Sequence, residues 1–78
     1  MTLLSRPGCH LCDDARAIVA AVCDELGVAW DEHDITADPE EFRRYADFIP
    51  VTLVDGAEHD FLRVSADRLR RALQAGQQ

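Results

Sequence analysis

Apolar residues recur with two different periods along this chain, and each change of period marks a new secondary-structure element. Residues 1–4 are a short apolar run that ends in the turn residues 5–8, which predicts a brief buried strand. In residues 9–26, apolar side chains recur every three or four positions, which is the period of an amphipathic helix. Gly27 follows as the C-terminal stop of that helix. Its apolar face consists of Ala15, Ile18, Val19, Val22 and Leu26.

The middle of the chain predicts an exposed strand followed by a short helix. Residues 28–35 set a few apolar side chains among charged ones, as in a half-exposed strand at the edge of a sheet, and we interpret Trp30 as a packing residue of that strand. Asp38 and Pro39 fit the N-cap and the first position of a second helix. This helix must be short, because Pro50 and the extended residue before it end it. The aromatic residues that we assign to the core or its margin are Phe42, Tyr45, Phe48 and Phe61.

The last third of the chain predicts a β-hairpin and a final helix. Residues 51–54 are all apolar or β-branched, which is typical of a strand covered on both faces. Asp55-Gly56 is a strong hairpin signal, after which residues 58–64 return as a fourth strand. Ser65 can cap the last helix, and residues 75–78 are expected to form a frayed tail. The inward positions of that helix are Ala66, Leu69, Ala72 and Leu73.

The predicted order is therefore β-α-β-α-β-β-α, an α/β fold. The first two strands are joined by a helix and should be parallel with a right-handed crossover, whereas the last two form an antiparallel hairpin. We expect one four-stranded mixed sheet flanked by three helices, with helices on both faces. The 78 residues are too few for two hydrophobic cores, so residues 1–78 are predicted to form a single domain.

Charge and hydropathy exclude several classes of function. The net charge of −7 argues against a nucleic-acid-binding protein and against a protein that binds anionic membrane surfaces. No apolar run approaches the roughly 18–20 residues of a membrane span. The first residues lack the basic and apolar regions of a secretory signal, so we expect a cytoplasmic protein.

The chemistry of the chain is concentrated in Cys9-His10-Leu11-Cys12, a C-x-x-C motif at a predicted strand-to-helix turn. Unpaired N–H groups and the helix dipole stabilise a thiolate at a helix N-terminus. Three residues along a helical turn also bring Cys12 beneath Cys9, within disulfide reach. We therefore expect Cys9, at the tip, to be the attacking thiol and Cys12 the resolving thiol. A protonated His10, and Arg6, would further stabilise the thiolate.

Other interpretations of the cysteines are weaker. Two cysteines can simply pack against each other, and Cys9, His10 and Cys12 are three potential zinc ligands. A structural zinc site usually takes four ligands from two separated clusters, so we expect no metal site. Cys23 lies eleven residues past Cys12, roughly 16 Å along a helix, which excludes a disulfide with the pair. We interpret Cys23 as a small, partly buried hydrophobic residue.

Three segments of the chain carry a resemblance to a known family. They are residues 5–12 after a short strand, residues 30–39, and residues 49–56, in which a proline opens an apolar strand. Together with the element order, they resemble the glutaredoxins of the thioredoxin-fold superfamily, and most closely the small bacterial glutaredoxin-like proteins. The resemblance implies that Pro50 is cis and faces the cysteine pair. It also implies that the backbone of Ile49 pairs with the bound peptide or glutathione.

The chain departs from the glutaredoxin pattern at two places. His10 and Leu11 occupy positions where glutaredoxins usually have Pro and Tyr. The usual Gly-Gly before the last helix is missing, and residues 63–66 read Arg-Val-Ser-Ala. Because those glycines let the chain approach the γ-glutamyl end of glutathione, we expect the side chains of Val64 and Ser65 to enter that space and weaken glutathione binding.

The motif and the resemblance predict a thiol–disulfide oxidoreductase that reduces protein or small-molecule disulfides. The expected substrates are a disulfide-containing protein or a glutathione mixed disulfide, and a reductase or a small thiol would restore the dithiol. We expect a monomer without a dissociable cofactor, with glutathione as a candidate co-substrate. Alternatives left open are an electron donor to ribonucleotide reductase, a carrier of a [2Fe–2S] cluster, and a redox-silent binding module. The expected substrate-binding residues are Arg6, His10, Leu11, Ile49, Pro50 and Ser65.

Overall fold

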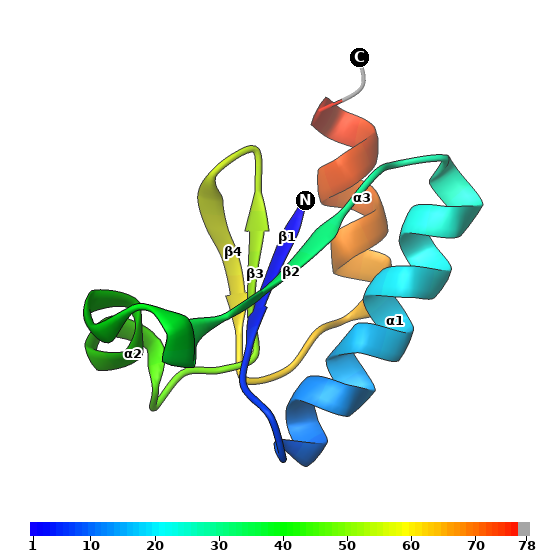
Figure 1. Ribbon diagram of the computed structural model, residues 1–78. Coiled ribbons are helices and arrows are strands. Elements are labelled where there is room, and N and C mark those ends of the chain that lie inside the picture. Colours follow the sequence, from blue (N-terminus) through cyan, green and yellow to red (C-terminus); the bar gives the residue numbers. More distant parts are fainter. Residues whose placement is uncertain (77–78) are drawn as a thin grey trace.

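The computed structural model describes residues 1–76, and their elements follow the predicted order (Figure 1). The strands are β1 (Thr2–Ser5), β2 (Asp31–Asp34), β3 (Val51–Val54) and β4 (Ala57–Phe61). The helices are α1 (His10–Leu26), α2 (Pro39–Tyr45) and α3 (Ala66–Gly76), with a 3₁₀ turn, η1 (Ile35–Ala37), between β2 and α2.

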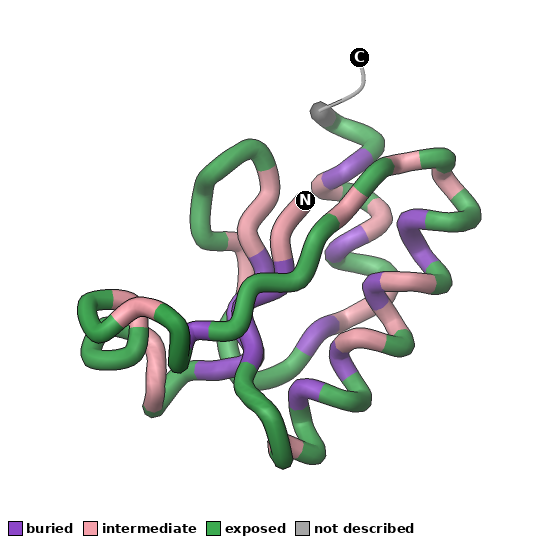
Figure 2. The backbone as a smooth tube through the Cα atoms, viewed as in Figure 1, coloured by how far each residue is buried: buried purple, intermediate pink, exposed green. Residues whose placement is uncertain are grey.

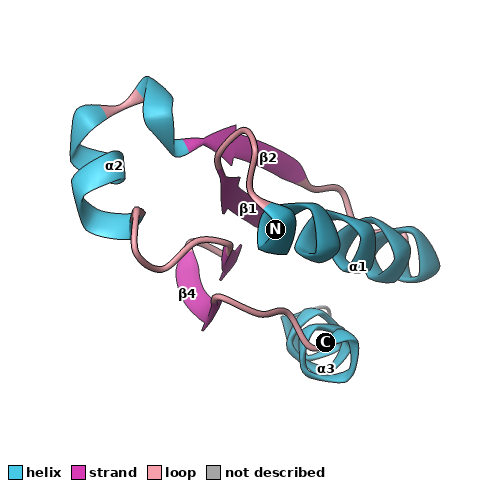
Figure 3. Ribbon diagram, turned by 90° about the horizontal axis from the view of Figure 1, so that it is seen from below, coloured by secondary structure: helices cyan, strands magenta, loops and turns pink. Residues whose placement is uncertain are grey.

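The four strands form one mixed sheet in the order β2-β1-β3-β4. β1 and β2 are parallel, as predicted for strands joined by a helix, whereas β3 is antiparallel to both β1 and β4. α1 and α3 lie side by side on one face of the sheet, and α2 stands on the opposite side (Figure 3). The carboxyl end of β1, where the chain turns into α1, therefore lies in the middle of the sheet.

Successive side chains of the central strands point to opposite faces of the sheet, and this produces two apolar clusters, one on each face. Leu3 faces α1 and α3 and packs with Val19 and Leu69 in the larger cluster. Leu4, the next residue, belongs to the smaller cluster, which also contains Val51 of β3. Figure 2 shows buried backbone on the inner sides of α1 and α3 and along β1 and β3.

The predicted boundary signals of the helices are present. Gly27 adopts the left-handed conformation (φ 67°), and its N–H bonds the carbonyls of Cys23 and Asp24, closing α1. Asp38 caps α2 by accepting a hydrogen bond from the Glu40 amide at 2.9 Å, with Pro39 at the first position.

Three boundaries differ from the prediction. β2 covers only Asp31–Asp34, because Trp30 packs against the larger cluster and Ile35 opens η1. β4 ends at Phe61, because Leu62 turns to a positive φ of 65°. α3 continues to Gly76, into the stretch expected to form a frayed tail, and residues 77–78 lie outside the described residues. None of the helices within residues 1–76 is both long and apolar enough to cross a membrane.

Candidate active site

The two cysteines of the C-x-x-C motif lie at the N-terminus of α1, directly after β1. Cys9 is the N-cap residue, with extended backbone angles, and its Sγ accepts a hydrogen bond from the Cys12 amide at 3.3 Å. The turn before it contains Gly8 at φ 75°, a conformation that favours glycine. Cys9 is partly exposed, whereas Cys12 is fully buried beneath it. One thiol of the pair is therefore open to solvent and the other is shielded.

Burial sets the protonation state of the inner cysteine. It raises the pKa of the Cys12 thiol to about 11, and a hydrogen bond with Cys9 adds to the rise. The backbone of Arg6 and the charge of Arg16 act in the opposite direction. Cys12 is accordingly a thiol at neutral pH.

A network around Arg16 joins the first turns of α1 to the edge of the sheet. The guanidinium bonds both oxygens of Glu32 in β2, at 2.6 and 2.7 Å, and Asp13 at 2.8 Å. The buried hydroxyl of Ser5 donates to the same carboxylate of Glu32 at 2.5 Å. Arg16 holds the pKa of the Glu32 carboxyl below its usual range. The acidic charge of Asp13, four residues from Cys9, is thus paired.

The Ile49–Pro50 segment lies against the dithiol. Ile49 is buried in the same cluster as Cys12, and Cys9 packs against that cluster. The Ile49–Pro50 peptide bond is cis, as the resemblance implied. The structure therefore brings together four of the predicted site residues, which come from the start of α1 and the start of β3.

Comparison with known proteins decides the family. The family model of the Glutaredoxin-like domain (DUF836) matches residues 1–74. This chain belongs to that family. The resemblance to glutaredoxins that rested on the cysteine motif and Ile49-Pro50 is confirmed.

The chain is also similar to curated relatives and to a solved structure. Uncharacterized proteins of Mycobacterium tuberculosis (strain H37Rv) and Mycobacterium bovis are each 34% identical over 73 residues, which cover 87% of this chain and 75% of the relative. The structure of thioredoxin 1 from Thermosipho africanus aligns with a TM-score of 0.61 at 12% identity, covering 99% of this chain and 97% of the thioredoxin. The thioredoxin-like α/β fold is thereby confirmed.

The other predicted site residues of this glutaredoxin-like chain lie around the dithiol or cap a helix. Arg6, His10 and Leu11 are exposed at the turn and the first residues of α1. Ser65 caps α3, because its hydroxyl accepts a hydrogen bond from the Arg68 amide at 3.3 Å. Arg6 and His10 are thus accessible to solvent at the tip of α1.

The expectation about Val64 needs correction. Its side chain is only 8% exposed and packs in the larger cluster between α1 and α3. It therefore packs in the core, whereas the sequence interpretation expected it to project from the surface. Ser65, the next residue, keeps a partly exposed side chain.

The sequence interpretation missed an apolar surface beside the site. Phe48 and Phe61 were assigned to the core or its margin, yet they are 48% and 41% exposed. Leu62 is also exposed, and it shares a shallow hollow with Leu11 of the cysteine motif. The sequence could not predict this exposure, because exposed and buried apolar residues cannot be told apart in a single sequence.

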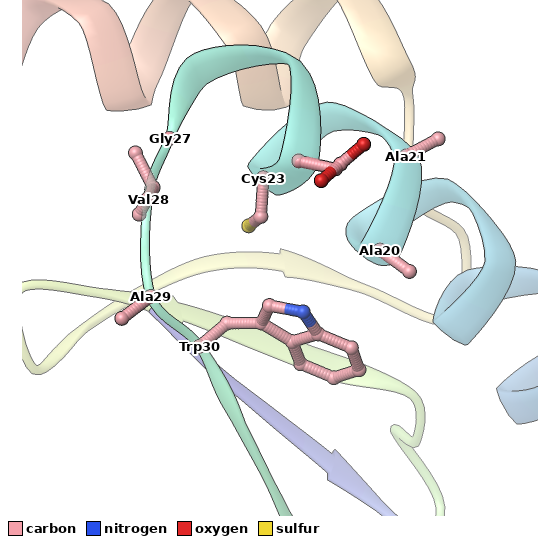
Figure 4. Close-up of a pocket in the computed structure, with 8 residues that line it drawn as sticks. Ala20, Ala21, Cys23, Gly27, Val28, Ala29 and Trp30 are labelled. Atoms are coloured by element: carbon pink, nitrogen blue, oxygen red, sulfur yellow. The ribbon is translucent and has the colours of Figure 1, made fainter.

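A second surface hollow lies at the other end of α1, away from the dithiol. Figure 4 shows the indole of Trp30 and the sulfur of Cys23 facing it. Cys23 is only 1% exposed, and burial raises the pKa of its thiol. Because the thiol of Cys23 is buried, we assign this hollow no chemistry. Within residues 1–76, no cluster of three His, Cys, Asp or Glu side chains could hold a metal ion.

Proposed function

We propose that this glutaredoxin-like protein is a thiol–disulfide oxidoreductase that reduces disulfides through Cys9 and Cys12. The observation that supports it most directly is the arrangement of the two sulfurs. The partly exposed Cys9 caps α1, and its Sγ accepts a hydrogen bond from the Cys12 amide at 3.3 Å. Cys12 lies buried behind it. In such a pair, the exposed cysteine can attack as a thiolate, and the buried cysteine can act afterwards as the resolving thiol.

The proposed reaction has two exchange steps. In the first, the Cys9 thiolate attacks one sulfur of the substrate disulfide, and the S–S bond breaks. The leaving thiolate takes up a proton, and Cys9 remains in a mixed disulfide. In the second, Cys12 loses its proton and attacks the Cys9 sulfur, which releases the second substrate thiol. The substrate gains two electrons and two protons, and the protein becomes a Cys9–Cys12 disulfide.

The raised pKa of Cys12 orders these steps. Because the pKa of Cys12 is raised to about 11, this thiol does not compete with Cys9 for the substrate at neutral pH. Its deprotonation belongs to the second step, in which the charge of Arg16 favours the Cys12 thiolate. A small thiol or a reductase then returns the dithiol to its reduced form.

Ile49 supplies the proposed backbone contact for an extended substrate. Among residues 1–76, no backbone hydrogen bond engages its N–H or C=O. Its side chain is buried against Cys12, so the peptide groups lie beside the dithiol. The family resemblance implies that this backbone pairs with a bound peptide or with glutathione.

A coupled reductase assay tests the proposal. The protein is mixed with a model disulfide and with either glutathione and its reductase or thioredoxin reductase, and NADPH oxidation is followed. We expect turnover with at least one electron source, and loss of that turnover in Cys9→Ser. No turnover with either source, in protein whose thiols titrate as free and reactive, would refute an oxidoreductase.

A further inference from the structure

We propose that the hollow between Tyr45, Phe48 and Phe61 is a subsite that binds an aromatic or large aliphatic side chain of a protein substrate with basic flanks. This inference rests on the proposed reduction of protein disulfides and adds to it the kind of partner that is recognised. The hollow has a volume of about 280 Å³. Its lining is completed by Arg44 and Glu58.

The walls of the hollow are aromatic. Phe48 and Phe61 form an edge-to-face pair with ring centroids 5.8 Å apart, and about half of each side chain remains exposed. Exposed aromatic side chains that touch and surround a concavity are typical of interaction sites, whereas single exposed apolar residues are ordinary. Ring faces and edges favour a further aromatic or aliphatic group over a polar one.

The polar groups at the rim already satisfy one another. Glu58 Oε1 accepts hydrogen bonds from the Tyr45 hydroxyl at 3.0 Å and from Arg44 at 3.3 Å. The guanidinium of Arg44 also lies over the Tyr45 ring, 5.3 Å from its centroid. A charged ligand would have to displace these pairs, whereas an apolar side chain would leave them in place. The chemistry of the hollow therefore favours an apolar occupant.

The backbone ties the hollow to the dithiol. The amide of Leu62 donates to the carbonyls of Phe48 at 3.0 Å and Pro50 at 2.9 Å. Phe48 directly precedes Ile49, whose side chain packs against Cys12. A substrate that reaches Cys9 and pairs with Ile49 would thus pass this hollow.

The strand register gives a second link between the hollow and the cysteines. Phe61 is the cross-strand partner of Val51, and Val51 is buried in the cluster that contains Cys12. Paired residues of neighbouring strands share one face of the sheet. The hollow and the dithiol are therefore held at a fixed separation. The subsite should select substrates by the number of residues between their cysteine and their apolar side chain.

Charge argues for a basic partner. The chain carries a net charge of −7, the lining residues Arg44 and Glu58 pair with each other, and the exposed Asp47 lies next to Phe48. Complementary charge speeds the encounter of partners and disfavours acidic ones. We therefore commit to a protein segment with an apolar anchor and Lys or Arg nearby, rather than to a second copy of this acidic chain.

Symmetric peptide disulfides test the subsite. Two identical short peptides are joined by one disulfide, with Phe or Ala at two to five residues from the cysteine and with Lys or Glu flanks. The value of kcat/KM is measured for the wild type, for Phe48→Ala, and for the matched control Phe42→Ala. Phe42 is 40% exposed and does not line the hollow, so it controls for loss of a surface ring.

We expect the wild type to prefer Phe over Ala about tenfold at one spacing, which is the effect of burying most of an aromatic side chain. Lys flanks should be preferred over Glu flanks, and this preference should weaken with salt. The Phe preference should disappear in Phe48→Ala and persist in Phe42→Ala. Equal preference in both variants, or no preference in the wild type, would overturn the proposal.

Two further measurements separate the subsite from the proposed activity. Binding of a peptide with serine in place of cysteine is followed through the NMR signals of the Phe48 and Phe61 rings. Ring shifts without any disulfide reduction would leave the subsite standing and refute the activity, whereas reduction without ring shifts would refute the subsite alone. A dimer in sedimentation that Phe48→Ala abolishes would assign the hollow to a second copy and overturn the partner proposed here.

Discussion

The backbone amide of Cys12 points at the sulfur of Cys9, 3.3 Å away. A cysteine sulfur thus occupies the capping position that Ser, Thr, Asp or Asn usually fills at the start of a helix. The group that satisfies the helix end is therefore also the sulfur nearest to solvent. The donor that this bond supplies stabilises negative charge on Cys9, and this sulfur is the one expected to attack.

Substitution of the cysteines one at a time should separate their roles. Cys9→Ser should abolish disulfide reduction, because no other exposed thiol lies at the helix tip. Cys12→Ser should accumulate a mixed disulfide on Cys9, seen by mass spectrometry. Cys23→Ala should keep the wild-type rate, since Cys23 is buried at the far end of α1. Faster alkylation of Cys12 or Cys23 than of Cys9 below pH 7 would contradict the assignment.

The release of the second substrate thiol should depend on pH. Burial is the largest cause of the raised pKa of Cys12, and it persists after Cys9 has joined the substrate. Below that pKa, the fraction of Cys12 in the reactive thiolate form rises about tenfold per pH unit. The release rate should therefore rise about a hundredfold between about pH 6 and about pH 8. Stopped-flow measurement of single turnovers checks this. A rate that is flat across this range would mean that Cys12 ionises far more easily.

Replacement of Leu62 should reveal backbone strain. Its φ of 65° lies in the left-handed region, where a residue with a Cβ is disfavoured. Leu62→Gly and Leu62→Ala both remove the exposed side chain, but only glycine accepts this φ without cost. We expect the free energy of unfolding, from urea titration, to be higher for the glycine variant by about 1 kcal/mol. Equal stability of the two variants would show that the segment relaxes.

Glutathione should be a poor substrate compared with a protein disulfide. The chain lacks the two glycines that allow close approach in glutaredoxins, although the N-terminus of α3 near Ser65 still offers amides to a carboxylate. Loss of one or two charge-assisted contacts should lower the affinity roughly tenfold or more. The measurement is a comparison of kcat/KM for a glutathione mixed disulfide and a protein disulfide. A strong preference for the glutathione substrate would show that the missing glycines are unimportant.

Much of the fold was predictable because its signals are local. The cap at Asp38-Pro39 and the stop at Gly27 depend on residues next to each other in the chain. The hairpin follows from Asp55-Gly56, whose φ values of 53° and 79° suit a tight turn between antiparallel strands. The cysteine motif at a helix start was visible for the same reason.

The features that the sequence did not reveal depend on distant partners. Residues 58–64 have the composition of a longer strand, but Leu62 leaves the ladder because its amide bonds two carbonyls of the loop before β3. Trp30 leaves the predicted strand because it packs on the larger cluster. The pairing of Arg16 with Glu32 joins residues sixteen positions apart, and only the parallel β1–β2 register makes them neighbours.

The acidic strand β2 affects how readily two copies of this protein can pair through the edges of their sheets. An edge strand has unpaired backbone N–H and C=O groups that can pair with another chain, and flat apolar edge strands promote aggregation. Here every residue of β2 is exposed, and three of the four are acidic, namely Asp31, Glu32 and Asp34. A second copy that approached this border would bring like charges directly opposite one another. Copies of β2 should therefore repel one another, which disfavours edge-to-edge pairing of the sheet through this strand.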